Sequence, residues 1–341
     1  MKTRIYAFLA LASILCFGAN AQQQESAKSM LDRITVRGFG MLGYDHHFTD
    51  GNDMGGFHIR LSEIIVDGRI TDRWSFGITS QFNNPVILKD LYMEYKISNA
   101  LRIKLGQFKT PYSLENQIAP FLSNLIPGAS HSGIFFNGIG IDPRCYGIAG
   151  RDIGLEFKGD IVDNKLSYRI MLMNGQGMNA KIDTRPTTHA ASLKIHLNDN
   201  LFLYGSYMTG TRLAQSDAFS LKAGEKYHRT RTGLALSGEY KDLRFVGEWL
   251  WGKDEDMKST GFYLTGAYQV APKVELIAAY DGLTLDTSDF ELQNAFTLGA
   301  QYWFYGRCRA QVQYRFIDNP IAFGKGVSSV HAIMTQLQFV F

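Results

Sequence analysis

Short segments of alternating apolar and polar residues recur along most of the chain, and this repetition constrains the fold more than any other feature. Period-two alternation is typical of β-strands, and no stretch shows sustained helical periodicity with caps. Sixteen such segments follow one another from Ile34 onward, at 34–45, 56–70, 74–82, 86–97, 101–109, 152–162, 166–175, 189–198, 201–211, 230–241, 243–253, 258–270, 274–285, 293–305, 308–318 and 328–341.

The connectors between these segments alternate in length. The short ones lie at 71–73, 98–100, 163–165, 199–200, 242, 271–273 and 306–307. The others are mostly longer, at 46–55, 110–151, 176–188, 212–229, 254–257, 286–292 and 319–327, with 83–85 as a short exception. Outer-membrane barrels have short periplasmic turns and long external loops. We therefore predict an all-β fold, a transmembrane antiparallel β-barrel of about sixteen strands over residues 34–341.

The polar face of these segments is charged, which indicates where it points. In segment 308–318, apolar residues at even positions alternate with Arg309, Gln311, Gln313 and Arg315. An Arg or Lys facing lipid near the membrane midplane costs roughly 2–4 kcal/mol, so the charged face is predicted to line the interior. An aromatic content of 13%, 34 glycines and a final strand ending on Phe341 fit the same class.

The first residues read as a secretory signal. Lys2 and Arg4 precede an apolar run that ends before a small-residue site, so residues 1–21 are predicted to be removed and 22–33 to form a short periplasmic segment. Lipoprotein processing at Cys16 is the alternative, disfavoured by Leu15 where a small residue is expected. Removing Lys2 and Arg4 leaves 33 of the 35 basic residues, against 32 acidic residues. This balanced charge excludes a nucleic-acid binder by bulk charge.

The connector at 110–151 is the third external loop and is unusually long. Loops beyond roughly 12–15 residues are usually functional or disordered. This one is too apolar for disorder, and we expect it to fold into the lumen and narrow the channel, with an external cap as the alternative. Its apolar residues include Ile118, Phe121, Leu122, Leu125, Ile126, Ile134, Phe135 and Phe136.

Selectivity in a pore comes from like charges at its constriction. Alternation predicts these basic pore-lining candidates: Arg60, Lys96, Arg102, Lys104, Lys109, Lys158, Arg169, Lys194, Arg244, Arg309 and Arg315. Arg144 and Arg151 are the basic candidates in the constriction loop, where Glu115 and Asp142 cancel their charge. The same alternation points Glu94, Asp152, Glu156 and Glu248 inward, so many wall charges are expected to pair.

Other chemistry is weakly indicated. His46 and His47 are predicted in the first external loop, and a solvated loop there is favoured over a metal site. Cys145 and Cys308 either form one disulfide or stay apart. No catalytic residues, cofactor or metal are expected, although Ser/His/Asp combinations on outer loops are defined by geometry rather than spacing.

One stretch resembles a known family. The residues Leu101-Arg102-Ile103-Lys104-Leu105-Gly106-Gln107-Phe108-Lys109-Thr110-Pro111-Tyr112 match a strand ending in Gly-Gln-Phe-Lys-x-Pro, followed by a long loop, in the phosphate-selective porin O and P family. The run 67–76 also looks like that family's second and third strands. The resemblance implies a trimeric, anion-preferring porin whose third external loop folds into the pore.

The resulting hypothesis is a bacterial outer-membrane porin for passive diffusion of small hydrophilic solutes, with a lean towards anions and phosphate as a possible solute. Outer-membrane lipid, lipopolysaccharide and a homotrimer are the partners expected from this class. A barrel enzyme of the protease or acyltransferase type is the first alternative, and ten or twelve strands would favour it. A structural barrel with a plugged lumen is the second.

Overall fold

The computed structural model describes residues 32–49, 53–83, 85–138, 150–180, 188–217, 221–286, 292–320 and 327–341. The chain divides into two compact units, Met1–Thr35 and Val36–Phe341. The predicted signal peptide lies outside the described residues, as do Asp142, Arg144 and Cys145. No helix among the described residues is both long and apolar enough to cross a membrane.

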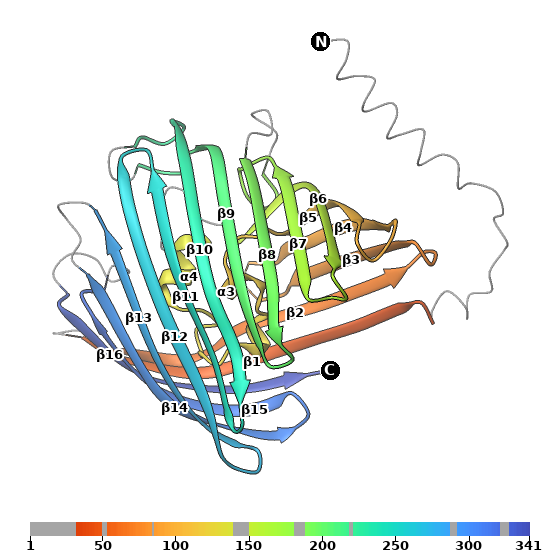
Figure 1. Cartoon of the computed structure of the whole chain (residues 1–341). Helices are drawn as coiled ribbons and strands as arrows, with labels where there is room; N and C mark the ends of the chain where they lie inside the picture. Colours follow the sequence, from red (N-terminus) through yellow and green to blue (C-terminus); the bar gives the residue numbers. More distant parts are fainter. Residues whose placement is uncertain are drawn as a thin grey trace. The chain divides into compact units, whose positions relative to one another are not determined.

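Sixteen antiparallel strands form one closed barrel in the second unit, as predicted (Figure 1). Each strand pairs with its neighbours in sequence, and β1 closes the ring against β16. The strands are β1 (Ile34–Thr49), β2 (Met54–Arg69), β3 (Trp74–Gln81), β4 (Ile87–Lys96), β5 (Arg102–Lys109), β6 (Arg151–Ile161), β7 (Leu166–Met173), β8 (Thr188–Asn198), β9 (Leu201–Leu213), β10 (Lys226–Tyr240), β11 (Leu243–Asp254), β12 (Met257–Ala271), β13 (Val274–Leu285), β14 (Gln293–Tyr305), β15 (Cys308–Asp318) and β16 (Ser329–Val340).

The two ends of the barrel differ in their connections. We call the end with the short turns the periplasmic rim and the end with the longer loops the external rim, following the usual asymmetry of outer-membrane barrels. The long connection between β5 and β6, residues 110–150, is called L3 below. It contains the short helices α3 (Leu114–Gln117), η1 (Pro120–Leu122) and α4 (His131–Phe136).

Backbone pairing and aromatic packing seal the closure of the barrel. The register runs from Phe39 opposite Val340 to Thr49 opposite Val330. On the outer surface, a Cβ placed on Gly40 would lie 2.4 Å from the ring of Phe339, so this ring covers the glycine. An aromatic ring folded over a strand glycine supplies the side-chain contact that the glycine lacks.

One strand irregularity, in β4, turns a charged residue inward. Opposite β3, Thr79 pairs with Asp90 while Ser80 pairs with Leu88, so Lys89 is the extra residue of a bulge. Lys89 consequently reaches the buried carboxylate of Glu63 on β2.

The prediction that His46 and His47 lie in the first loop is wrong, because β1 continues through both to Thr49. The His46 ring packs against Phe48 with 4.3 Å between centroids. Among the described residues, no group of three or more His, Cys, Asp or Glu side chains is placed to hold a metal ion. Cys308 is a buried free thiol.

Candidate functional site

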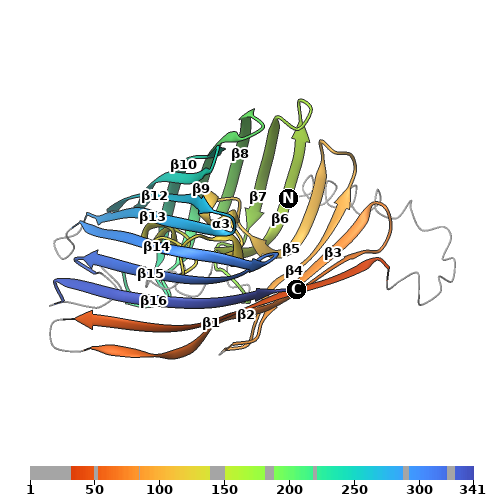
Figure 2. The same cartoon turned by 90° about the horizontal axis from the view of Figure 1, so that it is seen from below.

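L3 folds into the barrel, as the sequence predicts. Figures 1 and 2 show α3 and α4 inside the ring of strands, and α4 packs against β11, β12 and β13. The loop is closed at its base, because the backbone N–H and the hydroxyl of Thr110 both donate to the Gly150 carbonyl, at 2.9 and 3.2 Å. L3 therefore leaves and rejoins the wall at one point, and its described residues 110–138 fold into the lumen (Figure 1).

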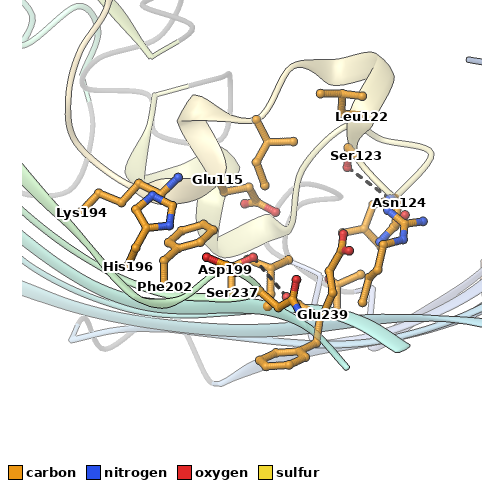
Figure 3. A pocket seen from close by; sticks show the side chains of 18 residues that line it. Glu115, Leu122, Ser123, Asn124, Lys194, His196, Asp199, Phe202, Ser237 and Glu239 are labelled. Atoms are coloured by element: carbon orange, nitrogen blue, oxygen red, sulfur yellow. Dashed lines mark hydrogen bonds between the residues drawn. The ribbon is translucent and has the colours of Figure 1, made fainter. Parts of the chain in front are cut away.

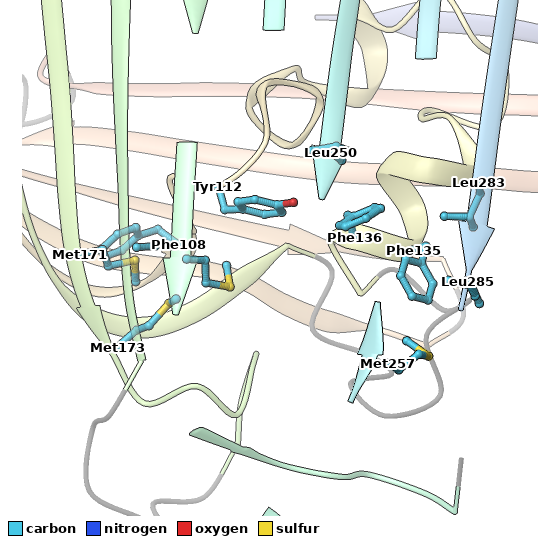
Figure 4. Packing of buried hydrophobic residues seen from close by; sticks show 12 residues of the cluster. Phe108, Tyr112, Phe135, Phe136, Met171, Met173, Leu250, Met257, Leu283 and Leu285 are labelled. Atoms are coloured by element: carbon cyan, nitrogen blue, oxygen red, sulfur yellow. The ribbon is translucent and has the colours of Figure 1, made fainter. Parts of the chain in front are cut away.

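Apolar packing holds L3 against the wall (Figure 4). Tyr112, Phe135 and Phe136 of L3 are all at most 1% exposed. Burying a large apolar side chain stabilises a structure by about 1.5–3 kcal/mol. The wall side of this cluster consists of Phe108, Met171, Met173, Ala190, Met208, Leu250, Met257, Leu283 and Leu285.

Glu248 on β11 anchors the start of α3. Its carboxylate accepts hydrogen bonds from the Leu114 N–H at 2.7 Å, the Glu115 N–H at 3.2 Å and the Ser113 hydroxyl at 2.9 Å. The Tyr263 hydroxyl donates to the same carboxylate at 3.0 Å. The first N–H groups of a helix have no partner within the helix, so a wall carboxylate satisfies them.

Helix α4 is held at each end by a wall charge that complements the helix dipole. Asp281 on β13 accepts from the His131 N–H, and from the N–H and hydroxyl of Ser132. At the other end, the guanidinium of Arg231 on β10 donates to the carbonyl of Phe136. An anion at the N-terminus and a cation at the C-terminus complement the helix dipole.

The segment after η1 is bound by long polar side chains of β15 and β16. Arg309 donates to the Ser123 carbonyl at 2.6 Å, and Gln313 donates to the Asn124 carbonyl at 2.6 Å. Gln338 donates to the Phe121 carbonyl at 3.1 Å. The polar face that alternation places inside the barrel therefore satisfies the backbone of a loop that lacks regular structure.

Glu115 lies within L3 and joins its two helices. Its carboxyl accepts from the N–H and the hydroxyl of Ser130, at 2.9 and 2.7 Å, and Ser130 in turn caps α4. Burial raises the pKa of Glu115 to about 8, despite these hydrogen bonds. Near neutral pH the side chain is therefore mostly protonated and adds little negative charge to the lumen.

Two cavities lie on opposite sides of L3. The external cavity, about 470 Å³, lies between L3 and the wall of β1–β6, and the periplasmic cavity, about 420 Å³, faces the wall of β8–β12. Glu115 and Ile118 line both cavities. These two residues therefore mark the partition that a solute crosses between the cavities.

The structure at the base of L3 explains the residues of the Gly-Gln-Phe-Lys-Thr-Pro signature. Gly106 has a φ of +139°, and a Cβ there would lie 2.2 Å from the Leu91 carbonyl oxygen, so only glycine fits. The Gln107 amide donates to two carbonyls of the β4 bulge. Lys109 extends into L3 and donates to the Ile118 carbonyl at 3.0 Å.

Most of the predicted basic candidates lie next to carboxylates. Arg60 pairs with Asp45 at 2.7 Å, Lys158 with Glu94 at 2.7 Å, Arg169 with Glu156 at 2.6 Å, Arg244 with Glu275 at 2.7 Å and Arg151 with Asp90 at 2.8 Å. Lys104 lies 3.6 Å from Glu94 and Arg315 lies 3.6 Å from Asp281, while Arg102 contacts Asp160. Lys96 lies opposite Arg102 on β5.

Lys109, Arg309 and Lys194, like Lys96, have no carboxylate within 4 Å in the described part of the chain. Lys109 and Arg309 donate to backbone carbonyls of L3, as described above. The Lys194 ammonium lies 4.0 Å above the ring of Phe202.

Sequence reasoning missed a further row of basic residues near the external rim. Arg212, Arg229 and Arg231 are each 1% exposed, and Asp254 pairs with the last two. The predicted strand began at 230, after Arg229. Extending the predicted segments to the observed ends of β9 and β10 adds Arg212 and Arg229, whereas Arg231 already lay within its segment and was not singled out.

Known proteins match this architecture. A family model, phosphate-selective porin O and P, matches residues 39–117. The anion-selective porin from Comamonas acidovorans has a TM-score of 0.70 at 13% identity, over 90% of this chain and 99% of that one. OmpF of Salmonella typhi in complex with daunomycin has a TM-score of 0.65 at 13% identity, over 90% and 97%. OmpT of Vibrio cholerae in its trimer form has a TM-score of 0.63 at 12% identity, over 90% and 100%.

No curated protein sequence matches the chain significantly. The structural matches are below 25% identity and show the fold, whereas the family match covers the region of the Gly-Gln-Phe-Lys-Thr-Pro signature. Residues 39–117 therefore match the phosphate-selective porin O and P family, and the chain has the 16-stranded barrel fold of an outer-membrane porin.

Proposed function

We propose that this porin conducts small hydrophilic solutes passively and prefers anions. The observation that carries the proposal is the lining of the external cavity. Its described residues include four basic side chains, Arg60, Lys89, Lys109 and Arg151, and one carboxyl group, that of Glu115. Because the pKa of Glu115 is raised to about 8, this carboxyl group adds little negative charge to the lining at neutral pH. A solute anion entering from outside meets this lining before it reaches the partition.

Lys109 is the basic residue best placed to act at the partition. It lines the external cavity and contacts Ile118, which lines both cavities. Anions would be concentrated at this point and would cross by electrodiffusion. The Comamonas acidovorans neighbour is named as anion-selective, which agrees with this direction.

Phosphate is a possible solute, but strict phosphate selectivity is not what the charges support. Lys89 and Arg60 are each paired with a carboxylate outside the lining, so their net contribution is small. A modest anion preference therefore fits the lumen better than a dense phosphate-binding ladder does. Conduction of this kind needs no cofactor.

An enzymatic role is the alternative from another class, and one cluster bears on it. His131 and Ser132 of L3 lie next to Asp281 of the wall. The Ser132 hydroxyl donates to Asp281 directly, whereas a catalytic triad needs the histidine between serine and acid. Sixteen strands also depart from the ten or twelve that we associate with the barrel enzymes. We therefore propose a channel without catalysis.

The assembly and processing follow from the same proposal. We propose that residues 1–21 are a cleaved signal and that 22–33 form a short periplasmic segment. We propose a homotrimer in contact with outer-membrane lipid and lipopolysaccharide, and the trimer form of the OmpT neighbour supports this stoichiometry. Chemical cross-linking of the purified protein would test it.

Single-channel recording in planar bilayers, with the reversal potential measured under a KCl gradient, tests the proposed function. We expect stepwise conductance and a reversal potential on the anion side. Lys109→Met should move the reversal potential towards zero, whereas Lys226→Met, at an exposed position of the external rim, should not. A silent protein that is correctly inserted would refute conduction and favour a plugged barrel. A cation-sided reversal potential would refute the anion preference.

A further inference from the structure

The periplasmic cavity differs in chemistry from the external one. L3 covers it from above, and the periplasmic ends of β8–β11 form its floor (Figure 3). Its volume of about 420 Å³ lies within the range of small-molecule sites. It is therefore large enough to hold an organic solute that has passed the partition.

Lys194 is the unpaired cation of this cavity. Within the described part of the chain, its ammonium makes no hydrogen bond or ion pair, and its contact is with the face of Phe202 at 4.0 Å. The ring of His196 lies 5.7 Å from that of Phe202. Figure 3 shows these three side chains grouped at one end of the cavity. A cation with free donors beside an aromatic face suits a ligand that carries both an anionic group and an apolar group.

The other charges of the cavity do not neutralise Lys194. Arg244 is bound through both carboxylate oxygens of Glu275, at 2.7 and 2.8 Å. The Glu115 carboxyl is bound to Ser130, and burial raises its pKa to about 8. Asp199 and Glu239 are exposed at the periplasmic rim, where solvent and salt screen them.

The rest of the lining combines polar groups with an apolar part. Ile118, Leu122 and Leu125 of L3 face the cavity from one side, and Val246 of β11 lines it from the other. An inorganic oxyanion would leave these surfaces without contacts, whereas an organic anion would cover part of them and gain from the burial of apolar area.

We propose that the periplasmic cavity is a binding site for small organic carboxylates with an aromatic or aliphatic body. The carboxylate binds the Lys194 ammonium, and the body lies against Phe202 and the apolar side chains of L3. This inference rests on the proposed channel function and names a solute class for it. It gives the pore two unlike sites in series, a basic external one and an amphipathic periplasmic one.

The test uses benzoate as the probe, with acetate and inorganic phosphate as comparison anions. Each is titrated on the periplasmic side of single channels in KCl, and the concentration that halves the open-channel current is measured. We expect benzoate to interrupt the current at a concentration at least tenfold lower than acetate or phosphate. Lys194→Met should raise the benzoate value by about tenfold, because a charge-assisted hydrogen bond is lost.

Two further variants make the result specific. Phe202→Ala should reduce the difference between benzoate and acetate, because it removes the aromatic face. Lys165→Met, on an exposed periplasmic turn, removes the same charge outside the cavity and should leave benzoate block unchanged. Equal block by benzoate and acetate, or unchanged block in the Lys194 variant, would overturn the proposal. The KCl conductance itself reports on the channel function, so a failure of that function is seen separately.

Discussion

Replacing Glu248 by alanine should release L3 from the wall, and the size of this effect can be worked out from the contacts. The carboxylate accepts four hydrogen bonds, and three of these come from residues 113–115 of L3. Each buried donor left without a partner costs about 1–3 kcal/mol, and a carboxylate at a partly buried helix N-terminus contributes up to ~2 kcal/mol. Because such losses are not additive, we expect a total of about 4 kcal/mol.

A loss of this size changes the ratio of docked to undocked L3 by roughly a thousandfold, since 1.4 kcal/mol corresponds to a factor of ten. Packing of Phe135 and Phe136 still opposes complete release. We therefore expect Glu248→Ala channels to fluctuate between conductance levels, with a larger maximum conductance than the unmodified protein. Glu248→Gln keeps one acceptor oxygen and should show a smaller effect.

Single-channel recordings at several voltages would measure these levels and their dwell times. Asp242→Ala serves as the matched control, because it removes an exposed carboxylate from a periplasmic turn that L3 does not contact. If Glu248→Ala channels show the same conductance and noise as the unmodified protein, the carboxylate does not hold L3 and the reasoning is refuted.

Three further results are expected. The pKa of Glu115 is raised above its unfolded value, so the contribution of this carboxyl group to L3 stability is complete below about pH 4.5 and is lost as the pH rises through about 8. Current noise in single-channel recordings should therefore grow over this pH window. Glu115→Gln should remove the pH dependence. Gly40→Leu should displace the Phe339 ring and lower the temperature at which the barrel unfolds in gel-shift assays, whereas Gly56→Leu, with no heavy atom within 4 Å of its added Cβ, should not. Gly106→Ala should impair barrel assembly, because its Cβ would lie 2.2 Å from a β4 carbonyl oxygen at a φ of +139°; normal yield of folded protein would contradict this.

The alternation of apolar and polar residues predicts the strands well because the membrane requires apolar side chains on the outer face of the barrel. The bounds of β13, β14 and β15 agree with the sequence prediction at both ends. The agreement fails at the external ends of β1 and β10, where the strands continue beyond the predicted segments. There Lys226 and His228 face outward on β10, so the apolar outer face that signals a spanning strand is lost.

The candidate site was harder to predict for a different reason. Alternation shows that Arg244 points inward, but its partner Glu275 is two strands away, and that pairing depends on register. Charge pairing between distant strands cannot be read from one sequence. The role of Glu248 was equally hidden, because it depends on how L3 folds back across the lumen.

The attachment of L3 through wall charges has a consequence for engineering this pore. In a channel whose loop was held by apolar contacts alone, charge substitutions could tune ion preference at constant geometry. Here Arg231, Arg309 and Asp281 both contribute to the field inside the barrel and determine the position of the loop that sets its width. The ion selectivity of the pore and its width are therefore coupled. Altering one independently of the other requires paired substitutions that exchange a wall charge and its loop contact together.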